Sequence, residues 1–306
     1  MNEPRIIHLS FSSEINRHAD VTRYNVTEGV GERSIIDVRN MDRLPNADLY
    51  VAEYFLSTRK HLDALPDDVK RKSICVVHTA GCLPEGPWGK IVALTHAWKR
   101  QLENHLVKVD RVIVPGIDLE PYKNVTPDYA GKTFGRMMRW NAQKIGPDFE
   151  AMVKAVLDGV PESRAKFWVS YPEKEDRPRI IDERVTYSGE CNIADFKGDH
   201  LKELSVYVHA NGTFRETLSF AVIEAMATGL PIVYLSEGTG VIEEVVGDAA
   251  VACVTMEEVL DTLIAYINME EGRRYAGKLS RMEAQRFDKN RMVKEFDALI
   301  EEKLRR

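Results

Sequence analysis

The sequence predicts an α/β protein built from two domains, each formed around a parallel sheet. Short apolar runs alternate with helical patterns along the chain, which is the rhythm of strand–helix–strand units. The rhythm stops at a stretch punctuated by Pro and Gly, residues 115–131, and then restarts. The chain has 306 residues, 44% of them hydrophobic and 29% charged, which is long enough for two globular domains.

In the first half, six runs rich in β-branched and apolar residues are expected to be strands. They are residues 5–10, 34–38, 48–52, 73–79, 90–95 and 111–115. Helices are expected over residues 54–65 and 96–107. Because strands and helices alternate, the strands should lie parallel.

In the second half, six more runs are expected to be strands separated by helices. They are residues 133–137, 166–171, 184–189, 205–210, 231–235 and 249–254. From about Met256 the chain should be helical, with many charges. We therefore expect an N-terminal domain at 1–122, a second domain at 123–284 and a C-terminal helix at 285–306.

The charge distribution argues against binding through a nucleic-acid backbone. The net charge is −6, and the first 125 residues are neutral overall, so the acidic excess lies in the rest of the chain. Binding to a nucleic-acid backbone usually goes with a clear basic excess. The basic clusters at 59–61 and 70–72 are expected to be solvated faces.

Features of export or membrane insertion are missing from the sequence. No apolar run approaches the ~20 residues of a transmembrane helix, and "MNEPRIIHLSFSSE" lacks the apolar core of a signal peptide. We expect a cytoplasmic protein. The four cysteines are scattered without a CxxC pair, so buried free thiols are expected rather than a zinc or redox site.

The stretch "GTFRETLSFAVIEAMATGLPIVYL", residues 212–235, places Glu216 and Glu224 eight positions apart around an apolar run. Solvated acids at the ends of an amphipathic helix are the ordinary explanation. However, apolar residues surround Glu224 on nearly every side of the helical wheel, so its carboxylate needs a partner or a ligand. We expect one helix to carry both acids, about 12 Å apart.

Other polar residues follow directly after predicted strands. In open α/β domains, ligands bind outside the carboxyl ends of the strands. His78 follows "SICVV", Gly135 and Arg136 follow "TF", Asn211 and Gly212 follow "SVYVHA", and "SEGTG" follows "PIVYL". The last two segments lead into helix N-termini, which bind anions.

These residues carry a family resemblance. Residues 205–253 resemble the C-terminal signature of family-four, or group one, glycosyltransferases, which have the GT-B fold. The pattern of this signature is a Glu, seven further residues, the sequence Glu-Ala-Met-Ala and a Gly-x-Pro turn. In this chain the two acids are Glu216 and Glu224, and the turn contains Gly229 and Pro231. Upstream, "VVHTAG", "RVIVPGID" and "FGRMMRWNAQKIG" are more weakly similar to family segments.

The resemblance implies two Rossmann-like domains that face one another across a cleft, with a shortened N-terminal domain on the acceptor side. It implies that Glu216 lies against the donor sugar, that Glu224 accepts hydrogen bonds from the nucleotide ribose, and that His78 lies near the reacting carbon. A purely structural His78 is the alternative. Further donor-binding residues implied are Thr217, Leu218 and Ser219, which replace the usual Gly-Phe-Gly, with Gly135, Arg139 and Gly212.

The chemistry of the leaving group points to cations. A nucleoside diphosphate departs as an anion and needs positive charge, which Arg136 and Lys144 would provide. Arg139 in place of Lys144 is the second possibility, and ordinary surface charge is the alternative for each cation. No Asp-x-Asp motif of metal-dependent transferases occurs in the sequence, so neither a metal nor a cofactor is expected beyond the donor substrate, a UDP-sugar or a GDP-sugar.

The expected function is that of a metal-independent, retaining glycosyltransferase of the hexosyltransferase type. The alternatives are a GT-B enzyme that hydrolyses or isomerises a nucleotide sugar and a catalytically silent nucleotide-sugar-binding protein. The acceptor, whether glycan, lipid, small molecule or modified nucleic acid, is not specified by the sequence.

Overall fold

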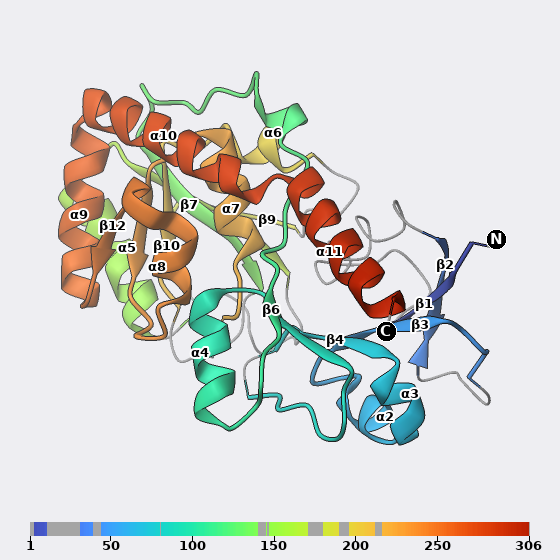
Figure 1. Ribbon diagram of the computed structural model, residues 1–306. Helices are drawn as coiled ribbons and strands as arrows, with labels where there is room; N and C mark the ends of the chain where they lie inside the picture. Colours follow the sequence, from blue (N-terminus) through green and yellow to red (C-terminus); the bar gives the residue numbers. More distant parts are fainter. Residues whose placement is uncertain are drawn as a thin grey trace. The chain divides into compact units, whose positions relative to one another are not determined.

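The computed structural model shows two compact units (Figure 1). The described residues are 3–10, 31–38, 44–79, 81–139, 145, 147–170, 180–189, 196–211 and 216–305. The first unit comprises Met1–Ile117, Glu216–Leu218 and Phe287–Arg306, and the second comprises Asp118–Arg215 and Ser219–Arg286.

The first unit is built on a six-stranded parallel sheet with the order β2-β1-β3-β4-β5-β6. The strands are β1 (Arg5–Ser10), β2 (Glu32–Asp37), β3 (Leu49–Tyr54), β4 (Ser73–Val77), β5 (Lys90–Ala93) and β6 (Arg111–Val112). Every residue of β3 and β4 is buried, as expected for central strands of a parallel sheet. The six strands predicted for this half are confirmed.

The helices of the first unit are α2 (Arg59–Asp63), α3 (Asp67–Arg71), α4 (His96–Asn104) and α11 (Lys289–Leu304). Helix α4 begins after Thr95, whose hydroxyl accepts a hydrogen bond from the amide of Trp98 at 3.0 Å. Helix α2 is shorter than predicted because Thr58 closes a turn first: its hydroxyl donates to Glu53 O at 2.8 Å and accepts from the amide of Phe55 at 2.8 Å.

Helix α11 completes the core of the first unit. Its apolar residues recur at helical spacing, so they form one buried face. They are Met292, Phe296, Leu299 and Ile300, and they pack with Ile6, Leu49, Val51, Ile74, Val76 and Val92 of the sheet. Residues close to the end of the chain therefore belong to the same unit as its first strand.

The second unit contains a six-stranded parallel sheet with the order β12-β11-β10-β7-β8-β9. The strands are β7 (Thr133–Arg139), β8 (Arg164–Ser170), β9 (Val185–Ser188), β10 (Val206–His209), β11 (Ile232–Leu235) and β12 (Ala250–Cys253). When the strands are numbered within the unit, this is the strand order of the doubly wound dinucleotide-binding fold. The strand order reverses between β7 and β10. All six predicted strands are confirmed.

The helices of the second unit are α5 (Pro147–Gly159), α6 (Lys197–Leu201), α7 (Phe220–Thr228), α8 (Val241–Val246), α9 (Met256–Asn268) and α10 (Glu270–Ala284). Helices α5 and α9 pack on the sheet through a shared cluster that includes Phe149, Val153, Leu263 and Ile267. Helix α7 ends at Gly229, whose φ of 91° is in the left-handed region that glycine favours.

Three of the four cysteines, Cys75, Cys82 and Cys253, are buried free thiols as predicted; Cys191 lies outside the described residues. No helix in the described part of the chain is both long enough and apolar enough to cross a membrane.

Candidate functional site

In the first unit, the carboxyl ends of β3 and β4 bring together Glu53 and His78. The two strands are neighbours, with Tyr54 paired to Val77, so the residue that follows β4 lies beside the end of β3. The Nε2 atom of His78 forms a short hydrogen bond with Oε2 of Glu53. Glu53 is only 2% exposed. A buried carboxylate therefore holds one nitrogen of the predicted site histidine.

The rest of His78 is also fixed in place. Its amide donates to Tyr54 O at 3.0 Å, and its carbonyl accepts a hydrogen bond from the Thr217 hydroxyl. The Phe55 ring is stacked on the imidazole with 4.2 Å between ring centroids and 21° between planes. With Nε2 bonded to Glu53, the second ring nitrogen, Nδ1, is the one left to meet a ligand.

The prediction that one helix carries both glutamates of the signature is wrong. Helix α7 begins at Phe220, and Ser219 before it is extended, with φ −114° and ψ 98°. Glu216 precedes the helix and belongs to the first unit, whereas Glu224 lies on α7. The physical reason is tertiary: Thr217 bonds to His78 O, and Leu218 packs against the apolar cluster that contains α11.

In the second unit, the reversal of strand order predicts a ligand site at the carboxyl ends of β7 and β10. Arg136 lies inside β7, three residues before its end, and is 1% exposed. Its Nη1 donates to Ala210 O at 2.7 Å and its Nη2 to Asn211 Oδ1 at 2.8 Å. The guanidinium also lies over the Phe149 ring, 5.7 Å from its centroid.

This network extends to the next strand end. Asn211 Nδ2 donates to Glu237 Oε1 at 2.7 Å, so β7, the end of β10 and the residues after β11 are joined. A direct contact between Arg136 and a phosphate would require the bonds to Ala210 and Asn211 to break. Sequence reasoning did not single out Glu237, although it lies in "SEGTG", directly after a strand.

Two of the other residues predicted to bind the donor, Arg139 and Gly135, belong to β7. Arg139 is the last residue of this strand, and Lys144 lies outside the described residues, as does Gly212. Gly135 is inside the strand, where an added Cβ would lie 1.8 Å from Lys166 O of β8. Its lack of a side chain permits close pairing of β7 with β8.

The Glu224 side chain on α7 is partly buried. Desolvation raises the pKa of its carboxyl to about 7, and the charge of Lys197 on α6 opposes the shift. Among the described residues no donor hydrogen-bonds this carboxylate. Tyr122 lies close enough that the Glu224 charge, second to burial, raises the pKa of the phenol. The carboxyl is thus desolvated and has free acceptor positions, which is the condition of a ligand-binding group.

Residues 133–268 match the family described as glycosyl transferases group 1. The resemblance inferred from the sequence is thereby confirmed over this segment, which contains β7, β10, α7 and Glu224. No curated protein sequence matches the chain significantly.

Solved structures with the same fold are GT-B glycosyltransferases. HepE from Anabaena, in complex with UDP and glucose, aligns with a TM-score of 0.73 and 14% identity over 97% of this chain and 99% of that chain. A glycosyltransferase from Rickettsia africae ESF-5 gives 0.72 and 12% over 99% of each chain. A TarM mutant from S. aureus, in complex with fondaparinux, α-GlcNAc-glycerol and UDP, gives 0.68 and 12% over 86% of this chain and 58% of its own. The fold of the chain is GT-B, as predicted.

The raised pKa of Glu224 predicts a pH-dependent cost in stability. A carboxyl whose pKa rises from 4.5 to about 7 on folding stabilises the folded protein below pH 4.5, and this contribution is lost between pH 4.5 and pH 7. We expect Glu224→Gln, which stays neutral, to raise the free energy of unfolding at pH 8 by up to about 3 kcal/mol and to change it little at pH 4. Urea denaturation at both pH values measures this.

The matched control is Glu183→Gln, which changes an exposed glutamate of the same unit. Its unfolding midpoint should follow the wild type at both pH values. An equal effect of Glu224→Gln at pH 4 and pH 8 would show that the carboxyl is not desolvated in the folded protein.

Proposed function

We propose that the protein is a retaining glycosyltransferase that moves a sugar from a UDP-sugar or GDP-sugar to a hydroxyl of an acceptor. The observation that carries the proposal is Glu224, a desolvated carboxyl without a described protein donor, placed within the group 1 segment. The UDP and glucose bound to HepE support a nucleotide sugar as the ligand class.

In the second unit, Glu224 would accept hydrogen bonds from the ribose hydroxyls, which favour its ionised form. Arg139 and Lys144, five residues apart, would meet the diphosphate. The start of α7 would add backbone donors, because its first residue follows Ser219, whose side chain makes no capping hydrogen bond. Arg136 would act on this site indirectly, by holding Asn211 and the end of β10.

In the first unit, His78 and Glu216 would contact the sugar. Glu53 is a positioning residue: when it accepts the Nε2 proton of His78, the Nδ1 atom becomes an acceptor for a sugar hydroxyl. Sequence reasoning missed Glu53. The one available signal was an acid near the end of "LYVAEY", a run that otherwise reads as a buried strand.

The reaction needs no general base from the protein. The bond from the anomeric carbon to the diphosphate oxygen breaks, and the acceptor oxygen forms its bond to that carbon on the same face. The acceptor proton passes to the departing phosphate oxygen. Cationic groups stabilise the charge that develops on the diphosphate in the transition state, and no metal is required in this scheme.

The proposal is tested by the pH dependence of donor binding. UDP-glucose and GDP-mannose are suitable probes because their diphosphate diesters do not titrate near neutrality. We expect affinity for one of them to rise up to about tenfold from pH 6 to pH 8, as Glu224 becomes ionised before binding. In Glu224→Gln the affinity should be lower by about 1 to 3 kcal/mol and independent of pH. Calorimetry measures both, and failure of the wild type to bind either donor at pH 8 would refute the proposal.

A pair of arginine variants tests which arginine side chain binds the diphosphate. Arg139→Ala should weaken binding of bare UDP or GDP without changing the unfolding midpoint. Arg136→Ala should lower the free energy of unfolding by about 1 to 3 kcal/mol, because Ala210 O and Asn211 Oδ1 lose their buried donors. Calorimetry and urea denaturation on both proteins separate the roles. The opposite pattern, with Arg139→Ala unstable and Arg136→Ala deficient only in nucleotide binding, would show that Arg136 binds the diphosphate directly and would contradict the assignment to Arg139.

The positioning role of Glu53 has a spectroscopic test. At pH 8 the ¹⁵N shifts of His78 in the free protein should show a protonated Nε2 and an unprotonated Nδ1. Glu53→Leu should give a mixture of tautomers and a lower rate of donor turnover, and Glu53→Gln, which keeps a carbonyl acceptor, should restore the wild-type tautomer and part of the rate. A wild-type signal from the Nδ1–H tautomer would contradict this assignment without affecting the evidence from donor binding.

A further inference from the structure

The sheet of the second unit has an open edge at β12. This strand lies at the end of the sheet order and is paired with β11. Cys253 O accepts a hydrogen bond from the Ser236 amide at 2.8 Å, so the backbone N–H and C=O groups of Cys253 point toward β11. Because the direction of the peptide groups alternates along a parallel strand, Ala250 and Ala252 direct their N–H and C=O groups away from β11. An exposed strand edge of this kind can pair with another chain.

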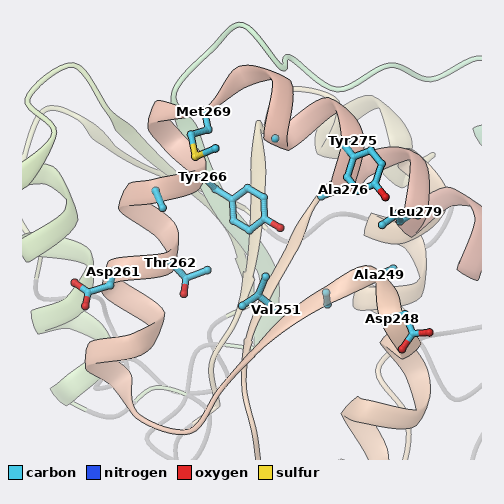
Figure 2. A pocket seen from close by; sticks show the side chains of 13 residues that line it. Asp248, Ala249, Val251, Asp261, Thr262, Tyr266, Met269, Tyr275, Ala276 and Leu279 are labelled. Carbon is cyan, nitrogen blue, oxygen red and sulfur yellow. The ribbon is translucent and has the colours of Figure 1, made fainter.

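A groove of about 580 Å³ lies along this edge (Figure 2). It is lined by residues of β12, of α9 and of α10, together with Asp248 and Ala249 before the strand. Figure 2 shows Val251 on the strand, with the Tyr266 ring projecting into the space between the two helices. The groove is therefore formed where the α9–α10 connection passes the sheet edge, away from the carboxyl ends of β7 and β10.

Large apolar side chains at this groove are exposed to solvent. Met269 is 58% exposed and Tyr275 is 67% exposed, and both line the groove. The Tyr266 hydroxyl makes no hydrogen bond with any residue that the structure describes. Exposed large apolar side chains that line one groove, beside unpaired backbone groups of a strand edge, are typical of an interaction site.

The charged residues of the groove indicate the charge of its partner. Its charged lining residues are Asp248 and Asp261, which lie on opposite sides of the groove in Figure 2. Neither carboxylate forms a hydrogen bond or an ion pair with a described residue. Two unpaired acids beside an apolar groove favour an occupant with cationic ends, and they oppose binding to an anionic lipid surface.

We propose that this groove binds an extended segment of a partner protein. The backbone of the segment pairs with Ala250 and Ala252, its apolar side chains fill the groove between α9 and α10, and a Lys or Arg near each of its ends pairs with Asp248 and Asp261. This mode of recognition combines main-chain hydrogen bonds from a sheet edge with side-chain pockets that set specificity.

The test uses the full chain and two fluorescently labelled hexapeptides. One is Lys-Val-Thr-Val-Thr-Lys with blocked ends, and the other has Glu in place of both Lys residues. Anisotropy titrations should show binding of the first peptide at least about tenfold tighter than binding of the second. Hydrogen exchange should show protection of the Ala252 amide when the first peptide is bound.

Two protein variants separate the backbone and charge contributions. Ala252→Pro removes the outward N–H of an edge strand, a position where proline is tolerated, and should abolish peptide binding, whereas Ala252→Ser should keep it. The double variant Asp248→Asn/Asp261→Asn should weaken binding of the Lys peptide about three- to tenfold, and Glu183→Gln, outside the groove, should leave it unchanged. Thermal denaturation checks that each variant is folded, and the double variant keeps the test decisive if Ala252→Pro unfolds.

Several results would overturn the proposal. Equal binding of the two peptides, no protection of the Ala252 amide, or full affinity in the double variant would each exclude the extended basic segment. Tighter binding of a small aromatic amine such as tyramine than of the Lys peptide would assign a small-molecule pocket instead. Self-association in sedimentation that Ala252→Pro abolishes would assign the edge to a second copy of this chain.

Discussion

A buried guanidinium joins the ends of neighbouring strands in the second unit. Arg136 is enclosed by the sheet and by Phe149, so its guanidinium must find acceptors within the protein. It finds them in Ala210 and Asn211, directly after β10, and Asn211 passes the link to Glu237, after β11. The order of strands is reversed at this place, and the segments that follow these strands lead into α7 and α8. The positions of Asn211 and Glu237 at these strand ends therefore depend on hydrogen bonds that start from a side chain inside the sheet.

The first unit shows the same arrangement in another chemical form. A carboxylate, Glu53, is buried at the end of one strand so that an imidazole at the end of the next is held in a single orientation. The Phe55 ring and the bond from Thr217 remove the remaining freedom of His78. In both units a buried side chain with an ionisable group orients the polar group beside it, which is the role expected of residues that preorganise a site.

Much of the fold follows from local sequence patterns, whereas the site depends on contacts between distant segments. The alternation of apolar runs predicted the twelve strands that the described part of the chain contains, because buried parallel strands are nearly continuous in apolar residues. The apolar wheel around Glu224 correctly indicated a carboxyl in a desolvated place. The helix predicted through Glu216 failed because Thr217 and Leu218 are held by residues far away in the sequence, His78 and the cluster with α11, which belong to the same unit. The partner of His78 was missed for the same reason: Glu53 is 25 residues away, and only the pairing of β3 with β4 makes them neighbours.

In the proposed reaction, the desolvation of Glu224 has a consequence for turnover. In the free protein near neutral pH, the carboxyl is divided between its protonated and ionised forms because its pKa is about 7. A ribose that donates hydrogen bonds to the ionised form must first draw the carboxyl into that form, so part of the interaction energy is used for ionisation and does not contribute to affinity. The same loss applies to the nucleoside diphosphate that remains after transfer, since it carries the same ribose. In the proposed reaction the desolvated carboxyl would thus recognise the nucleotide through directed hydrogen bonds while limiting how tightly the product is held, and release of product is a step that sets the rate of many enzymes.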